Sequence, residues 1–465
     1  MNPFFNVLTT KSEVLPLMVL VQSSKFSLPS SSPQTTSFLL EPNSLSLALM
    51  HSDSSLSLFP SLPFPSPFSL LSKPQTLIPP PSSSFSFLLL HHHHLPHPRV
   101  LFLVAAPHKG GSQILFRFYI LNSNNGFSKA QVVCNQKGLG FDSKFGVLVD
   151  VNHGVSIKIV GSINFFAMYS VSNRKVWVFA LKPIGDGDGV GDAVKLMRCA
   201  VIDCCLPVWS ISISFGYLIL GEDNGVRVFN LRHLVKGNVK RVKSSNSNGN
   251  LDSNGRLDSK GLRLPNGVIG GDRHCGSTAC NGLLDGKIDK HCVSVKNRSV
   301  RCRQDSGEGG AIFVAFKSKE VEISKSTAKA VSIQALSPKK FMILDSTGDL
   351  HILCLSNPVG GSNIRSNLMH LPQSMKVQKL AVLPDISSRI QTFWISDGFH
   401  SVHMMTASET DPVIENDGEE SKEKLMQISV IQAIFAGEKI QDLVPLAANA
   451  FLILGQGTVW AYAIP

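Results

Sequence analysis

One phrase recurs along this chain: an apolar strand, a tight polar turn and a second apolar strand. Its clearest copy spans residues 217–231, where YLIL leads into the turn GEDNG and then into VRVFNL. Gly, Asn and Asp tolerate the positive φ angles of short hairpin turns, so the phrase predicts a β-hairpin. Self-similarity of this kind is the signature of a repeat architecture, and it constrains the fold more than any other feature.

Six further copies share this plan. They lie at residues 46–59, 100–121, 164–181, 341–355, 392–405 and 451–463. The first strand of each copy is nearly continuous in apolar residues, which predicts burial of both its faces. The second strand alternates in the clearest copy: Val226 and Val228 share one face and Arg227 lies on the other, so we expect a half-exposed outer strand.

More strand-like runs accompany the hairpins, so that each copy can supply about four strands. They lie at residues 146–151, 155–160, 199–204, 208–213, 311–316 and 377–383. About seven such units fall within the range of roughly four to eight blades found in β-propellers. The sequence therefore predicts an all-β fold: a single β-propeller of about seven four-stranded blades, spanning residues 37–465 and interrupted by disordered inserts.

An N-terminal segment, residues 1–36, precedes the propeller. The last hairpin, 451–463, ends at the C-terminus and so cannot supply the outer strands of the first blade. An open edge strand is a liability in a ring. We therefore expect part of the N-terminal segment, the stretch Val14–Val21, to pair with the first or the last blade.

The largest insert spans residues 236–310 and holds most of the excess positive charge of a chain whose formal net charge is +11. It is rich in Asn, Ser and Gly and poor in apolar residues, which predicts disorder. The candidate basic tether within it consists of Lys236, Lys240, Arg241, Lys243, Arg298, Arg301 and Arg303. Such a tether can bind phosphate backbones, serve in nuclear import, or simply keep a solvated loop soluble. Its lack of aromatic residues disfavours the binding of single-stranded nucleic acid by base stacking.

No catalytic constellation is evident. Neither a G-x-S-x-G motif nor a P-loop spacing occurs. The Cys and His residues of the insert do not have the spacing of a zinc site, and Gly185–Gly189 lacks the further ligands of a calcium loop. We therefore expect no enzyme activity, no catalytic residue, no cofactor and no metal. The Trp residues, which we expect in the core, are Trp177, Trp209, Trp394 and Trp460.

Targeting signals are weak. No apolar run reaches the ~18 residues of a membrane span, and Leu15–Val21 lacks the basic region of a signal peptide. Several of the nine Cys lie in or beside apolar strands, as expected of a reduced intracellular protein. We expect a cytoplasmic or nuclear protein, or both, without a membrane partner. The Ser-rich, acid-poor start has some features of a plastid transit peptide but lacks Arg before Arg99, so plastid targeting is the less favoured interpretation.

Residues Gly221–Leu231 resemble the last hairpin of a WD-repeat blade, with Phe229 and Asn230 at the position of the family dipeptide. No copy contains Trp-Asp itself, and the Gly-His pair of the family is missing. The Ser-rich start and the run 132–138 are similar to an uncharacterised plant propeller family. The resemblance implies a non-enzymatic scaffold that binds protein partners, and it supplies no functional residues. The alternative is a factor associated with nucleic acid, RNA or chromatin, through the basic insert.

Overall fold

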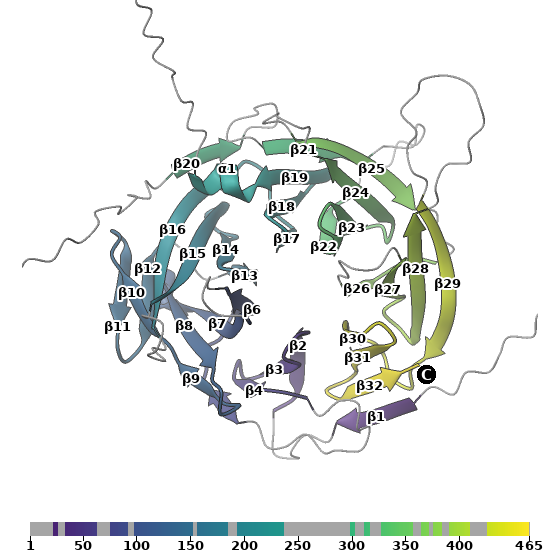
Figure 1. Ribbon diagram of the computed structural model, residues 1–465, viewed down its shortest axis with the longest axis horizontal. Helices are drawn as coiled ribbons and strands as arrows, with labels where there is room; N and C mark the ends of the chain where they lie inside the picture. Colours follow the sequence, from purple (N-terminus) through teal and green to yellow (C-terminus); the bar gives the residue numbers. More distant parts are fainter. Residues whose placement is uncertain are drawn as a thin grey trace, which may run out of the picture. The chain divides into compact units, whose positions relative to one another are not determined.

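The computed structural model describes thirteen segments of the chain. They are residues 22–26, 33–62, 75–91, 97–151, 156–184, 193–236, 298–302, 311–316, 327–356, 364–371, 375–383, 390–409 and 426–464. Within them the strands form seven sheets arranged as the blades of a β-propeller, with the first strand of each blade innermost (Figure 1). The predicted fold class is thus confirmed.

Blades 1 to 4 use residues from Thr35 to Ala315. Blade 1 consists of β2 (Thr35–Glu41), β3 (Ser46–His51), β4 (Leu56–Phe59) and β5 (Thr76–Ile78). Blade 2 consists of β6 (Ser84–Leu90), β7 (Arg99–His108), the 3-10 turn η1 (Lys109–Gly111), β8 (Gln113–Leu121), β9 (Phe127–Lys129), β11 (Leu139–Asp142) and β12 (Gly146–Asp150). Blade 3 consists of β13 (Ile157–Gly161), β14 (Phe165–Ser170), β15 (Lys175–Ile184) and β16 (Ala193–Cys204). Blade 4 consists of β17 (Ser210–Ser214), β18 (Tyr217–Glu222), β19 (Gly225–Asn230), the helix α1 (Leu231–Lys236) and β21 (Ala311–Ala315).

Blades 5 to 7 complete the ring. Blade 5 consists of β22 (Ala330–Ser337), β23 (Lys340–Asp345), β24 (Leu350–Ser356) and β25 (Arg365–Leu371). Blade 6 consists of β26 (Lys379–Val382), β27 (Ile390–Ser396), β28 (Ser401–Glu409) and β29 (Met426–Phe435). Blade 7 consists of β30 (Asp442–Ala447), β31 (Ala450–Leu454), β32 (Val459–Ala463) and, as its outer strand, β1 (Gln22–Phe26).

Each of the seven repeat copies forms the second and third strands of one blade. The copy at 217–231 contains β18 and β19, for example, and the one at 451–463 contains β31 and β32. Asn224 and Gly348 adopt φ angles of 58° and 85° in the turns between these strands. This is the left-handed conformation that Gly, Asn and Asp tolerate, as the residues of the turns predicted.

The third strands are more buried than the alternation predicted. All four residues of β4 are buried, as are Gly225–Phe229 of β19. A fourth strand pairs with the outer edge of each third strand. The two neighbouring blades cover the two faces of the third strand. Arg227, expected on a half-exposed face, is 3% exposed and paired with Glu222.

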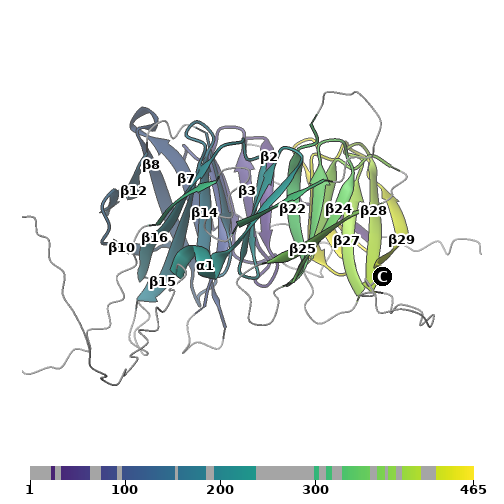
Figure 2. The ribbon, with the colours of Figure 1, turned by 90° about the horizontal axis from the view of Figure 1, so that it is seen from above.

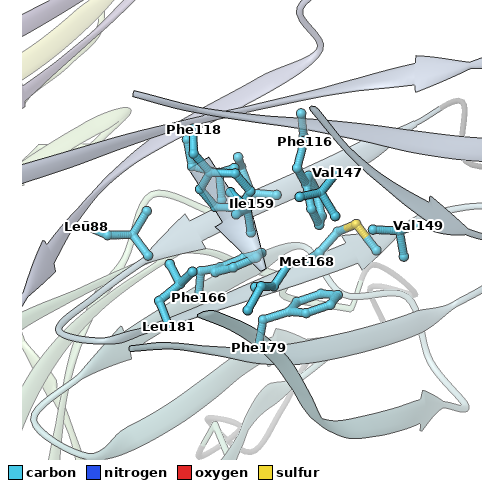
Figure 3. Packing of buried hydrophobic residues seen from close by; sticks show 14 of the residues in the cluster. Leu88, Phe116, Phe118, Val147, Val149, Ile159, Phe166, Met168, Phe179 and Leu181 are labelled. Carbon is cyan, nitrogen blue, oxygen red and sulfur yellow. The ribbon is translucent and has the colours of Figure 1, made fainter. Parts of the chain in front are cut away.

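The core lies between blades rather than within one. Seven clusters of buried apolar residues are each shared by two neighbouring blades. In the cluster between blades 2 and 3, Phe166 and Phe179 stack with ring centroids 4.7 Å apart, and Phe116 meets both rings edge-on (Figure 3). Each blade therefore depends on its neighbours for burial of its faces.

The N-terminal segment supplies the last strand of the ring. β1 pairs antiparallel with β32, with Gln22 opposite Ala463 and Phe26 opposite Val459. Phe26 packs against the cluster between blades 7 and 1. The strand used is Gln22–Phe26, whereas the expected stretch, Val14–Val21, lies outside the described residues.

Two strands extend the outer edge of blade 3 by parallel pairing, which the sequence did not predict. β10 (Gln131–Cys134) pairs with one half of β16, and β20 (Arg298–Cys302) pairs with the other. Because β20 lies inside the insert 236–310, the expectation that this whole insert lacks structure does not hold there. The remaining insert residues after Lys236 lie outside the described segments.

Removal of residues 1–26 should destabilise the ring, because β32 would then become an unpaired edge beside an exposed apolar cluster. We expect a lower Tm and increased aggregation, measured by differential scanning fluorimetry and light scattering. Removal of residues 1–20 alone, which spares β1, is the matched control and should leave both unchanged. Equal stability of the two truncated proteins would contradict a closing role for β1.

Candidate protein-interaction face

One face of the ring carries the turn between the second and third strands of each blade together with the start of each first strand; we call it the top face. Antiparallel order within a blade brings these two features to the same end. The backbone reflects this: Asp223, in the turn of blade 4, forms a bridge with Lys329, which directly precedes β22 of blade 5. The N–H groups of Asn224 and Ser346 donate to the carbonyls of Ala328 and Lys329, respectively.

Trp209 is the centre of a polar cluster on the top face. Its indole Nε1 donates a hydrogen bond to Asp223 Oδ1 over 2.8 Å. Lys329 Nζ lies 4.1 Å from the ring centroid, a cation–π distance. Lys158 Nζ donates to the Trp209 carbonyl over 3.0 Å. Residues of blades 3, 4 and 5 thus hold one Trp in a fixed orientation.

This cluster has a net positive character with an apolar surface at its centre. The indole remains partly exposed, and Lys158 is exposed. Asp223, its one carboxylate, already accepts the indole hydrogen bond. One ammonium group over the indole ring and a second at the backbone carbonyl of the same residue suit a carboxylate-bearing, partly apolar ligand.

Sequence reasoning missed this cluster because Trp209 stands in an apolar run. Trp177 and Trp394 are core residues as predicted, at 6% and 0% exposure, whereas Trp209 and Trp460 are partly exposed. One signal was present: Trp209 is followed by the alternating run Ser-Ile-Ser-Ile, typical of a strand with one exposed face.

Buried polar pairs occupy equivalent positions beneath the top-face turns of three blades. They are His51 with Ser57, Glu222 with Arg227, and Asp345 with His351. Each pair joins the end of a second strand to the start of a third. Their distances, 2.8 to 2.9 Å, satisfy side chains whose burial would otherwise be costly.

The His51–Ser57 pair has the distance of a nucleophile and its general base, but its surroundings do not fit catalysis. Both side chains are buried, at 5% and 6% exposure, so a substrate has no access to the hydroxyl. The neighbouring carboxylate, Asp53, accepts hydrogen bonds from Ser55 instead of orienting the imidazole. Burial lowers the pKa of His51, although the charge of Asp53 opposes this. The pair is therefore a structural contact.

The Asp345 carboxylate is the most strongly perturbed acid of the blade 5 turn. Burial alone would raise its pKa, but hydrogen bonds from His351 and Thr347 and from backbone N–H groups outweigh burial and lower the pKa to about 2. In the same turn Asp349 forms an ion pair with Lys376 over 2.9 Å. Lys376 precedes β26, so this pair joins the turn of blade 5 to blade 6.

Asp442 opens β30, the innermost strand of blade 7. Burial raises its pKa, although the charge of Lys379, at the start of β26, opposes this shift. No group of three or more His, Cys, Asp or Glu side chains with a metal-binding arrangement occurs among the described residues.

The thiols of two described cysteines are poor nucleophiles. Burial raises the pKa of Cys134 to about 11, and burial likewise raises that of Cys199 to about 11. A thiol with such a pKa is almost wholly protonated at neutral pH. The insert cysteines considered as zinc ligands lie outside the described residues, apart from Cys302 on β20.

The basic tether is only partly described. Lys236 ends α1, and Arg298 and Arg301 lie on β20. The other residues of the tether, which lie outside the described segments, are Lys240, Arg241, Lys243 and Arg303. α1 contacts β16 (Figure 2), and β20 pairs with β16 (Figure 1), so Lys236 and Arg298 both lie at the outer strand of blade 3.

Comparison with known proteins gives likenesses of fold alone. No protein-family model and no curated protein matches the chain. The Cps50 (Swd1) β-propeller domain of Myceliophteria thermophila aligns with a TM-score of 0.47 and 8% identity, over 96% of this chain and 100% of that one. The WD40 repeats of RRP9 align with a TM-score of 0.43 and 8% identity, over 95% and 97%. U3-55K aligns with a TM-score of 0.43 and 8% identity, over 95% and 98%.

Similarity to a plant propeller family stays an expectation. Among the described residues, no helix has the length and apolar character needed to cross a membrane.

Asp345→Asn should make stability less dependent on pH. The folded pKa of Asp345, about 2, lies below its ordinary value of 3.8, so its stabilisation is present above about pH 4 and is lost as the pH falls toward 2. At neutral pH the variant should lose about 1–3 kcal/mol, because His351 loses a charged partner. We expect the Tm difference from the wild type to shrink steadily in acid. A constant difference over the whole pH range would contradict the assignment.

Proposed function

We propose that this protein is a non-enzymatic scaffold that binds other proteins through its top face. The observation that carries the proposal is the Trp209 cluster. Three blades fix a partly exposed indole there, with Lys329 over its ring and Lys158 on its backbone carbonyl. Aromatic residues with a polar handle are enriched in protein interfaces, where they supply contact area at low entropic cost.

The ligand that fits this cluster is an acidic peptide segment with an apolar residue. A carboxylate can reach Lys158, while an apolar side chain can cover the exposed part of the indole. The cluster is already ordered by its own hydrogen bonds, which reduces the entropic cost of binding. The buried Glu222–Arg227 pair joins the two strands on either side of the turn that carries Asp223, and it offers no accessible reactive group.

Charge reversal on the top face tests this proposal. Lys158→Glu and Trp209→Ala should weaken partner binding about tenfold or more, a change of ~1.4 kcal/mol, because each removes an element of the cluster. Partners would be identified by affinity capture of the wild-type protein, and their affinity would then be measured with purified components.

Lys339→Glu is the matched control. Lys339 is exposed in the turn between β22 and β23, at the end of the blade opposite the top face, and the substitution makes the same change in charge. Equal loss of binding in this control would indicate a non-specific charge effect. Unchanged binding in both top-face variants would contradict the proposed face, and absence of any protein partner would contradict the scaffold itself.

A second candidate function is association with RNA or chromatin through the basic insert. It is favoured by the basic residues of the insert, of which Arg298 and Arg301 lie on β20, the strand that pairs with β16. A cytoplasmic or nuclear location, or both, is compatible with either candidate.

Salt dependence separates the second candidate from the first. A fluorescent RNA probe should bind the full-length protein with an affinity that falls steeply with added salt, because binding releases counterions. Replacement of residues 238–295 by a short Gly/Ser linker should abolish this binding. The Tm should not change, since the deletion spares α1 and β20. RNA binding that survives the deletion would exclude the insert as its site.

A further inference from the structure

The outer strand of blade 6 differs from a typical protected sheet edge. β29 is ten residues long and terminates its sheet, and no strand of the described segments pairs with its outer side (Figure 1). Three of its large apolar side chains are well exposed: Val430 at 60%, Ile431 at 56% and Phe435 at 77%. Soluble proteins rarely leave a long apolar edge open, because such an edge templates pairing with another strand.

The usual protective devices are largely missing from this edge. No charged residue occurs in the sequence from Ile428 to Phe435, ISVIQAIF, and no proline interrupts it. A β-bulge opposite Met404 and Met405 is its one irregularity. By contrast, the edge of blade 3 is covered by β10 and β20, and β25 of blade 5 exposes polar side chains, including Arg365 and His370.

The direction of the backbone groups can be read from one hydrogen bond. The Ala436 N–H, directly after β29, donates to the carbonyl of His400, directly before β28, over 2.8 Å. Backbone groups of successive residues alternate in direction along a strand of an antiparallel sheet. The N–H and carbonyl groups of Ala433 and Phe435 therefore point away from β28, toward the open edge.

We propose that two copies of this chain associate by antiparallel pairing of β29 with β29, about a two-fold axis at Ala433. In this register Ala433 pairs with its own symmetry mate, and Ile431 of each copy lies opposite Phe435 of the other. The outward-pointing N–H and carbonyl groups of Ala433 then bond to those of its symmetry mate, next to the β-bulge at Ile431, and the two blades join into one sheet. This inference concerns a different surface from the top face and does not depend on the proposed function.

Two features of this edge favour pairing with its own copy: it carries no charged residue, and its smallest side chain lies at its centre. In a two-fold interface every group near the axis meets its own copy, so a charged residue would meet a like charge. This edge carries none. The smallest side chain, Ala433, falls on the axis, where bulk would collide with bulk. Ile431 opposite Phe435 is a pair of β-branched and aromatic residues, a combination that stabilises antiparallel sheets.

The test uses the full-length protein, with its mass measured by sedimentation velocity over a range of concentrations. The wild type should show a concentration-dependent species of twice the chain mass of 50.4 kDa. Ala433→Lys and Ala433→Glu should each be monomeric, because each places like charges together at the axis. A mixture of the two variants should restore the species of double mass, because opposite charges then meet.

Leu77→Lys is the control for a general effect of charge on an outer strand. Leu77 is 70% exposed on β5, the outer strand of blade 1, and its substitution should leave self-association unchanged. Both Ala433 variants should retain the Tm of the wild type, since this side chain is exposed. A wild type that stays monomeric at all concentrations would overturn the proposal, including the case in which β29 instead binds a strand of another protein. Dimers of the Ala433 variants, or a mixture that remains monomeric, would overturn the register.

Discussion

The pairing of β1 with β32 is the constraint on which the remaining structure depends. It joins residues 22–26 to residues 459–463 and so closes a ring in which every core cluster is shared by two blades. A blade in such a ring cannot bury its faces alone, and opening one joint exposes the apolar faces on both sides of it. The entropic cost of closing a loop rises only slowly with loop length. Pairing of two segments this far apart in sequence is therefore feasible once the other six interfaces between blades have formed. Closure therefore links local hairpins to a cooperative whole.

The hairpins could be predicted from sequence because their signals are local. Apolar runs and the residues of a tight turn lie within fifteen residues in the copy at 217–231, and each copy proved to be the second and third strands of a blade. Burial of the third strand was underestimated because neighbouring blades determine it. The parallel pairing of β10 and β20 with β16 escaped prediction for the same reason: the partners are distant in sequence, and neither short strand carries a pattern that specifies the other.

The Trp209 cluster likewise combines contacts that are local in sequence with contacts between blades. Trp209 and Asp223 lie in one blade, and Asp223 stands in a turn that the sequence did predict. Lys158 and Lys329 come from the two adjacent blades, so no spacing along the chain could have joined them to the indole. The Glu222–Arg227 pair, by contrast, spans a single turn, and its opposite charges on either side of the Asp-Asn-Gly turn were visible in the sequence. Alternation led to an exposed assignment for Arg227 because it cannot report that a neighbouring blade, rather than solvent, covers that face.

Propeller blades bury most of their side chains against one another, so the surfaces left for recognition are the two faces and the outer edges. In this chain those surfaces differ in chemistry. The top face near Trp209 is polar, basic and ordered by hydrogen bonds, whereas the edge at β29 is uncharged and apolar. Pairing at the edge would leave both top faces free, because β29 lies on the circumference and the top-face turns lie at the ends of the strands (Figure 1). Antiparallel pairing reverses the strand direction between the copies, so the two top faces would point in opposite directions and each Trp209 cluster would be open to a partner of its own.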